Sequence, residues 1–205
     1  MRQPPGGIAS AALILAGVAA LALAALRPRG AAHPVTPAMR AEAGAMAGRP
    51  APTLALVGTD GAAHSPAGAA CDRAAVVFFI QDGCPCSEAA DPHFRRLRDA
   101  YGDRAAFLGV IDADLATARD WAARHATPYP ILADPRRELI AACRVGRSAS
   151  ALLVAPGGRV EALWPGYSAG MLAEVGARLA RRAARAEVPL DTRDAPRELT
   201  AGCRF

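Results

Sequence analysis

The sequence predicts an α/β fold in which a central sheet is flanked by helices. Residues 74–80 (AAVVFFI) form an unbroken apolar run rich in β-branched and aromatic side chains, which is typical of a strand buried on both faces. Residues 90–101 follow with apolar side chains at spacings of 4, 3 and 4, which predicts an amphipathic helix. A second apolar run at 105–111 completes a strand, helix and strand unit, and this alternation indicates an α/β sheet.

The chain after residue 111 continues the same alternation. We expect helices at 115–125, 138–143 and 168–186, a short strand at 130–133, and a hairpin of strands at 151–155 and 159–164 around the turn Pro156-Gly157-Gly158. A further strand is expected at 53–57, and the strand at 74–80 should be central in the sheet. One folded domain therefore spans 53–186, and residues 187–205, broken by prolines, are expected to form an irregular C-terminal tail.

The N-terminal part carries a candidate membrane span. Residues 8–26 are apolar and uncharged over a length close to the roughly 20 residues that cross a bilayer core. The run exceeds the h-region of a secretory signal and stops at Arg27 and Arg29, so we expect residues 1–30 to be an uncleaved signal anchor. A cleaved signal peptide and a buried core helix are the alternatives. Residues 31–52, rich in Ala, Pro and Gly, are predicted to be a flexible tether.

Composition excludes several classes of protein. All 24 basic residues of the 205-residue chain are arginine, which excludes a P-loop lysine, a Schiff-base lysine and a kinase-type lysine. The net charge is +5, but the arginines alternate with acids and aromatic residues make up only 5% of the chain. We therefore expect no nucleic-acid partner.

Cys84 is the first candidate for chemistry, because it lies between the strand at 74–80 and the following helix. Pro85 suits the first helical position, which makes Cys84 the N-cap. There the unpaired backbone N–H groups and the helix dipole should lower the pKa of the thiol, although Asp82 works against this. The thiolate is the nucleophile of disulfide exchange. Two buried structural cysteines, Cys84 and Cys86, are the alternative.

The order of these segments resembles the thioredoxin fold, and within it the redoxin, or AhpC/TSA-like, branch that includes peroxiredoxins and membrane-anchored thiol-disulfide oxidoreductases. The resemblance spans 53–186 and rests on FFIQDGCPCS at 78–87, YPILADPRREL at 129–139 and ALLVAPGGRV at 151–160. It implies a thiol or disulfide protein, or a small thiol, as partner, with Cys84 attacking a disulfide and Cys86 or Cys203 resolving the mixed disulfide. No cofactor and no resident metal are implied.

The motif departs from the family around its cysteines. Thioredoxins carry Cys-x-x-Cys, whereas Cys86 lies only two positions after Cys84 and Ser87 occupies the third. We expect the Ser87 hydroxyl to bind the Cys84 thiolate. Gln81 and Val77 stand where the peroxiredoxin pattern has threonine and proline, so a peroxiredoxin-like antioxidant activity is a secondary expectation.

A second departure concerns the segment before the hairpin. Thioredoxins hold a cis-proline there, and the corresponding residue here is Ala149. A cis bond at that residue would cost about 3 kcal/mol. Peptide-backbone recognition of the thioredoxin kind is thus not expected, and a low-activity interaction scaffold is one alternative function.

The remaining cysteines bear on the redox question. The chain has five cysteines, so at least one is unpaired within a monomer. Cys143 is expected to be buried and inert, and Cys71 lies in a loop. Cys203 lies on the mobile tail, within the sequence TAGCRF, where it could resolve a disulfide formed at Cys84. The cysteine content fits an oxidising compartment, which favours a domain anchored in the inner membrane and facing the periplasm or cell exterior.

A copper-handling protein is the rival interpretation. Two thiolates in Cys-x-Cys, with His93 or a tail cysteine, could hold Cu(I) or Zn(II), which resembles a copper-carrier branch of the thioredoxin fold. His93 is nine residues after Cys84, roughly 13 Å along a straight helix, so it should not be a ligand. His93 and His125 are expected at the surface, and His33 and His64 carry no signal.

Overall fold

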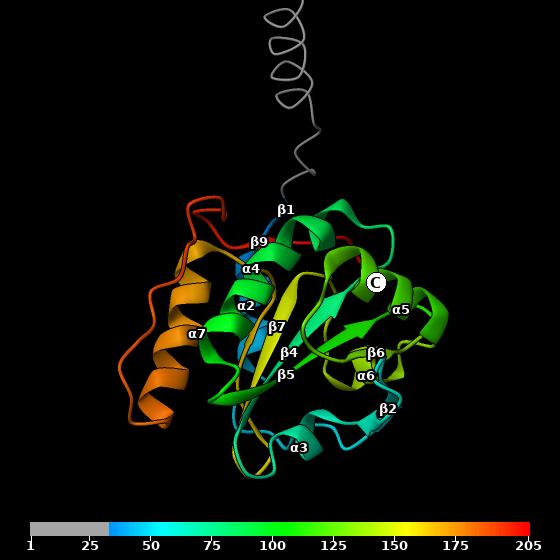
Figure 1. Cartoon of the computed structure of the whole chain (residues 1–205). Coiled ribbons are helices and arrows are strands. Elements are labelled where there is room, and N and C mark those ends of the chain that lie inside the picture. The colour runs from blue at the N-terminus through cyan, green and yellow to red at the C-terminus, as the bar shows by residue number, and fades with distance from the viewer. Residues whose placement is uncertain (1–32) are drawn as a thin grey trace, which may run out of the picture. The chain divides into compact units, whose positions relative to one another are not determined.

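The computed structural model describes residues 33–205 of the chain. These residues fold around a five-stranded sheet of order β6-β5-β4-β7-β8 (Figure 1). Its strands are β4 (Ala74–Ile80), β5 (Ala105–Ile111), β6 (Ile131–Ala133), β7 (Ser150–Ala155) and β8 (Arg159–Trp164). β5 and β6 run parallel to β4, β7 is antiparallel to β4, and β8 is antiparallel to β7. The predicted α/β sheet with β4 at its centre is confirmed.

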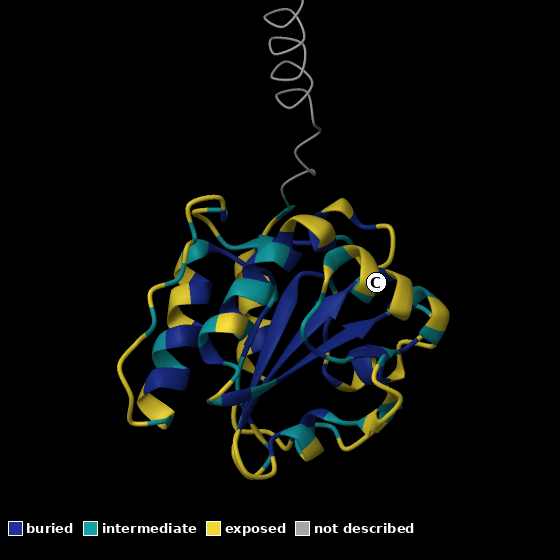
Figure 2. Ribbon diagram, viewed as in Figure 1, coloured by how far each residue is buried: buried dark blue, intermediate teal, exposed yellow. Residues whose placement is uncertain are grey.

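β4 is covered on both faces, which explains its unbroken apolar sequence. Every residue of the strand is buried, and the most exposed of them, Ile80, shows only 5% of its surface. Phe78 belongs to a core cluster on one face of the sheet, while Val77 and Phe79 belong to a cluster on the other. Figure 2 shows the strands buried between helices with exposed outer sides.

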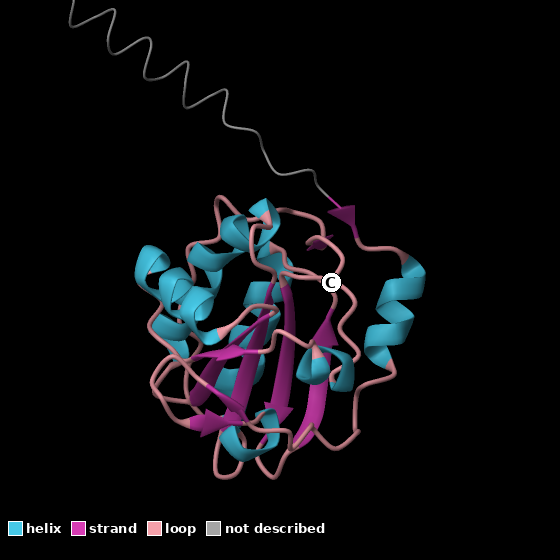
Figure 3. Ribbon diagram, turned by 90° about the vertical axis from the view of Figure 1, so that its right-hand side faces the viewer, coloured by secondary structure: helices cyan, strands magenta, loops and turns pink. Residues whose placement is uncertain are grey.

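Two layers of helices enclose this sheet (Figure 3). The helices are α2 (Pro37–Gly44), α3 (Pro66–Ala69), α4 (Pro85–Tyr101), α5 (Leu115–His125), α6 (Glu138–Ala142) and α7 (Ala169–Arg182). α4 and α7 bury their apolar residues in the cluster around Phe78, whereas α2 and α6 contribute to the cluster around Phe79. α5 lies beside β6, and its Trp121 is fully buried. A small hairpin of β2 (Leu56–Val57) and β3 (Ala63–His64) completes this part of the chain.

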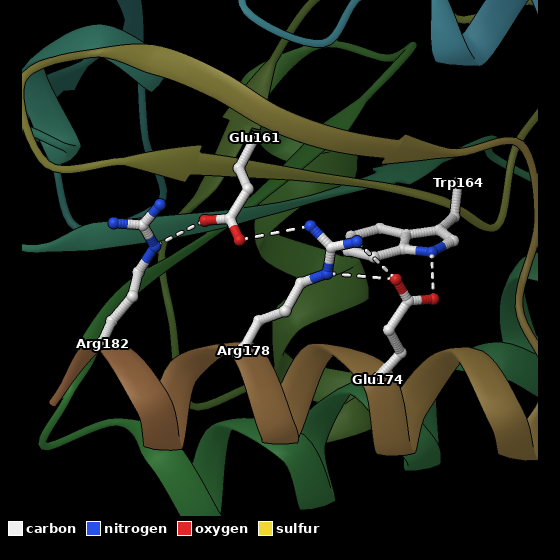
Figure 4. A network of polar contacts seen from close by, with 5 residues as sticks. All are labelled: Glu161, Trp164, Glu174, Arg178 and Arg182. Atoms are coloured by element: carbon white, nitrogen blue, oxygen red, sulfur yellow. Dashed lines mark hydrogen bonds and ion pairs between the residues drawn. The ribbon is translucent and has the colours of Figure 1, made fainter. Parts of the chain in front are cut away.

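A chain of alternating charges joins α7 to β8 (Figure 4). Glu161 of β8 accepts hydrogen bonds from Arg178 at 3.2 Å and Arg182 at 2.5 Å. Arg178 also donates to Glu174 at 2.6 Å, and Glu174 in turn accepts from the Trp164 indole at 3.1 Å. Partly exposed pairs of this kind contribute about 1 kcal/mol or less each. Their main effect is to fix the position of α7 along the edge strand.

The structure differs from the expected tether over residues 33–52. β1 (His33–Pro34) leads into α2, whose N-cap Thr36 accepts a hydrogen bond from the Met39 amide and whose first residue is proline. Ala43 and Met46 are buried in the core cluster that contains Phe79. Thr36 followed by proline was the available signal for this helix start.

The predicted anchor at 8–26 lies outside the described residues. Within residues 33–205, no helix combines the length and the apolar character that a bilayer span requires.

The C-terminal segment is mostly irregular, as expected, but it contains one short strand. β9 (Thr200–Ala201) pairs antiparallel with β1, so that His33 lies opposite Ala201 and Pro34 opposite Thr200. Thr200 also exchanges two backbone hydrogen bonds of 3.0 Å with Tyr167. The segment before α2 and the tail after α7 are therefore joined.

Candidate redox site

Cys84 lies directly before the first residue of α4, as the sequence predicts. It is the N-cap residue, with φ −89° and ψ 115°, and Pro85 takes the first helical position. The turn from β4 passes through Gly83, whose φ of +67° lies in the region that glycine adopts at least cost. Cys84 is only 3% exposed, so a substrate cannot reach it unless a neighbouring segment moves.

The sulfur of Cys84 is surrounded by hydrogen-bonding groups. It lies 2.8 Å from the Sγ atom of Cys203 and 3.4 Å from the Ser148 hydroxyl. Burial opposes ionisation of the thiol, but hydrogen bonds from Cys203, Ser148 and the Ser87 backbone outweigh it and lower the pKa of Cys84 from 9.0 to about 6. At neutral pH Cys84 is therefore mostly thiolate.

The two neighbouring thiols are shifted the opposite way. The hydrogen bond to Cys84 is the main cause that raises the pKa of Cys203 to about 12, and burial adds to it. Burial, followed by the charge on Cys84, raises the pKa of Cys86. The group of three sulfurs thus carries a single negative charge, which resides on Cys84. The Cys203 thiol donates a hydrogen bond to this thiolate.

Backbone pairing brings Cys203 to this position. The Ser148 amide donates to the Cys203 carbonyl at 3.0 Å, and the Gly202 amide donates to the Ser148 carbonyl at 2.9 Å. Gly202 allows the close approach, because a Cβ atom there would lie 2.1 Å from the Ser148 hydroxyl oxygen. Gly166 has the same role beside β9, since its Cβ would lie 2.4 Å from the Thr200 carbonyl oxygen. The tail therefore occupies a surface shaped to receive it.

Gln81 fixes the tail from the other side. Its side-chain amide donates to the Arg204 carbonyl at 2.6 Å, and its backbone amide donates to the Ser87 hydroxyl at 3.0 Å. The Ser87 hydroxyl thus stabilises the turn before α4, while the Ser87 backbone N–H donates to the Cys84 carbonyl at 3.0 Å. This differs from the expected hydroxyl-to-thiolate hydrogen bond.

Ala149 takes the place of the cis-proline in a different conformation. The described residues contain no cis peptide bond, and Ala149 has a left-handed φ of +57°. A non-glycine residue in this region costs roughly 1 kcal/mol or more. Its amide donates to the Phe79 carbonyl at 2.8 Å, which holds Ser148 beside Cys84. The backbone hydrogen bonds of Ser148 in this segment are made with the protein's own tail.

The expected burial of Cys143 is observed, whereas the expected exposure of two histidines is not. Cys143 is fully buried, as expected, and burial raises its pKa to about 12. Cys71 is exposed in a loop. His93 is not on the surface, since it is 5% exposed and packs against the Tyr167 ring at 5.7 Å. His125 is also partly covered, with its Nδ1 atom 3.7 Å from the buried Asp91 carboxylate.

Two residues of the site were not predicted from the sequence. Ser148 was not among the expected site residues, and His33 was expected to carry no signal. The structure places a ring nitrogen of His33 and the sulfurs of Cys86 and Cys203 within 4.8 Å of one another. No local pattern could reveal this, because His33 reaches the site only through the pairing of β1 with β9.

The fold is thioredoxin-like, and the candidate site is built around cysteine thiols at the start of α4. The chain belongs to the AhpC/TSA family, whose profile matches residues 47–163. It matches no curated protein.

Solved structures share the fold. One is the bacterioferritin comigratory protein of Xanthomonas campestris, which is described as having alkyl peroxide reduction activity. It superposes with a TM-score of 0.55 at 22% sequence identity, and the match covers 63% of this chain and 92% of that chain. An uncharacterised conserved protein from Geobacillus kaustophilus superposes with a TM-score of 0.62 at 19% sequence identity, and the match covers 77% of this chain and 90% of that chain. A secreted Mycobacterium tuberculosis disulfide oxidoreductase homologous to E. coli DsbE superposes with a TM-score of 0.53 at 19% sequence identity. The match covers 62% of this chain and 95% of that chain.

The low pKa of Cys84 predicts the pH at which its thiol ionises. The ultraviolet thiolate absorbance of the reduced protein should rise with an inflection near pH 6, and this step should be missing in Cys84→Ser. Ser148→Ala removes one stabilising hydrogen bond and should move the inflection to higher pH, whereas the exposed Cys71→Ser should not change it. An inflection near the free thiol value of about 8.5 would contradict the arrangement.

The close approach of Gly202 predicts the effect of adding one methyl group. Gly202→Ala should displace the tail at an overpacking cost of roughly 1–3 kcal/mol. Amide hydrogen exchange at Ser148 should then be about tenfold faster or more, and the pKa of Cys84 should rise. Gly146→Ala is the matched control, since a Cβ there meets nothing within 4 Å. Equal exchange in the two variants would show that the tail is not docked in solution.

Proposed function

We propose that this redoxin is a thiol-disulfide oxidoreductase in which Cys84 is the nucleophile and Cys203 is the resolving thiol. The observation that carries the proposal is the 2.8 Å separation of the two sulfurs, with the pKa lowered at one and raised at the other. Such a pair supplies an ionised attacker and a protonated partner in reach of each other. No cofactor is needed, because the electrons pass between sulfur atoms.

The first step is attack on a substrate disulfide. The Cys84 thiolate displaces one substrate sulfur as a thiolate and forms a mixed disulfide with the other. The charge on Cys84 disappears in this step. The hydrogen bond that holds the proton on Cys203 is thereby lost, so the pKa of Cys203 falls and the thiol can ionise.

The second step closes the internal disulfide. The Cys203 thiolate attacks Cys84 and releases the second substrate sulfur, so the substrate gains two electrons and the protein holds a Cys84–Cys203 disulfide. A reducing dithiol partner returns the protein to its starting state by the reverse exchange. Cys86 is the alternative resolving thiol, since it lies in the first turn of the same helix.

The docked tail supports a peptide as substrate. Ser148 uses both its amide and its carbonyl to hold Gly202 and Cys203 beside the nucleophile. A cysteine-containing peptide that displaces the tail can take up the same two hydrogen bonds, which is a form of strand addition. A disulfide-bonded protein therefore fits the site, and a small disulfide requires less displacement of the tail.

Peroxide reduction is the second candidate. The family and the likeness to peroxiredoxin folds favour it, and the chemistry balances: the Cys84 thiolate reduces peroxide to water and becomes a sulfenic acid, which Cys203 converts to a disulfide with loss of a second water. Gln81 and Val77 replace the expected threonine and proline, and Gln81 is engaged by the tail. This ranks peroxide below disulfide substrates.

Cysteine variants test the assignment. With insulin or glutathione disulfide as substrate, Cys84→Ser should reduce turnover to background. Cys203→Ser should stop after one exchange and accumulate a mixed disulfide visible by mass spectrometry, whereas Cys86→Ser and Cys71→Ser should turn over.

Three results would contradict this order of events. Full activity in Cys84→Ser would exclude the nucleophile, and arrest in Cys86→Ser alone would make Cys86 the resolving thiol. Faster consumption of hydrogen peroxide than of either disulfide would promote the peroxidase alternative.

We also propose that residues 8–26 anchor the protein in the inner membrane with the redox domain facing the periplasm or cell exterior. The apolar run and the cysteine content support this placement. A membrane-impermeant maleimide should label the exposed Cys71 in intact cells, and deletion of 8–26 should move the protein to the soluble fraction. Labelling only after lysis would contradict the orientation.

A further inference from the structure

A group of soft metal ligands lies beside the redox pair. A ring nitrogen of His33 and the sulfurs of Cys86 and Cys203 all fall within 4.8 Å of one another, and no carboxylate belongs to the group. The three residues come from β1, the first turn of α4 and the tail after β9. Segments from both ends of the described chain therefore converge on one point.

The backbone holds these three segments without help from the side chains of the group. β1 pairs with β9, and the Val35 amide donates to the Leu199 carbonyl at 3.1 Å. Beyond β9, Ser148 holds Gly202 and Cys203. The fold thus brings the donors together before any ion binds, which lowers the entropic cost of binding.

The donor types select the kind of ion. Thiolates and an imidazole favour soft ions such as Cu(I) and Zn(II), whereas calcium and magnesium require oxygen ligands. Donors on a three-coordinate ion with metal–sulfur bonds of about 2.3 Å lie about 4 Å apart. The group satisfies this spacing with small adjustments, because its atoms already lie within 4.8 Å.

The position of Cys84 decides between the two ions. Zinc in a closed protein site takes four ligands, and two sulfurs on a tetrahedral zinc lie about 3.8 Å apart. Cys84 is the nearest further sulfur, at 2.8 Å from Cys203, but as a zinc ligand it would no longer be available as the nucleophile of the proposed redox cycle. A three-coordinate Cu(I) uses the existing donors and leaves Cys84 outside the ligand set.

We propose that the reduced protein binds one Cu(I) ion through His33, Cys86 and Cys203. Where the redox cycle proposed above operates, it controls this site. Formation of the Cys84–Cys203 disulfide consumes a ligand as the substrate disulfide gains the two electrons and leaves as two thiols. Copper is then held by Cys86 and His33 alone and is released to a competitor.

Anaerobic titration of the reduced full-length protein with Cu(I) tests the proposal, with a colorimetric Cu(I) chelator as competitor. We expect one ion per chain and X-ray absorption with two sulfur neighbours and one nitrogen neighbour. His33→Ala, Cys86→Ser and Cys203→Ser should each weaken binding at least tenfold. The matched controls are His64→Ala, whose histidine is bound to Asp60 at 2.8 Å, and Cys71→Ser.

Cys84→Ser separates the copper site from the proposed redox function. This variant should lose disulfide turnover yet retain Cu(I) with an affinity within a factor of about three of the original. Loss of copper in Cys84→Ser with unchanged binding in His33→Ala would overturn the ligand set. Absence of stoichiometric copper, or displacement of Cu(I) by an equal amount of Zn(II), would overturn the site while leaving the disulfide assay unaffected.

Discussion

The site depends on the backbone pairing between Ser148 and the tail. Two hydrogen bonds and the close approach of Gly202 bring Cys203 within 2.8 Å of Cys84. Without this contact Cys84 would keep the helix start and the Ser87 amide but lose the hydrogen bonds of Cys203, which oppose the effect of burial on its pKa. The pKa of Cys84 therefore depends on a segment more than a hundred residues away in sequence.

Under the proposed function, the single charge on Cys84 imposes an order on the chemistry of the three thiols. While Cys84 is ionised, Cys203 and Cys86 remain protonated, because a second negative charge so close would be unfavourable. Consumption of the Cys84 charge removes that restraint. In the proposed cycle, Cys203 therefore stays protonated until Cys84 has reacted.

Local sequence patterns were sufficient for the sheet and for the position of Cys84 at the start of α4. The apolar run of β4 and the position of Pro85 after Cys84 are contiguous features, and both were confirmed. Contacts between distant segments were not predictable in this way. His33, Ser148 and Gly202 acquire their roles only because β1, the loop before β7 and the tail meet in space. The start of α2 was missed for a different reason, since its cap at Thr36 lies in an alanine- and glycine-rich stretch that resembles a linker.

The pairing of β1 with β9 has a mechanical consequence. β1 continues the chain that arrives from residue 32, and β9 leads within two residues to Cys203. Tension applied to the chain before His33 would load this two-residue ladder first, at the end that carries His33 and Ala201. Opening of this ladder would withdraw His33 from Cys86 and Cys203, while Tyr167 and Ser148 still hold the tail through their own backbone hydrogen bonds.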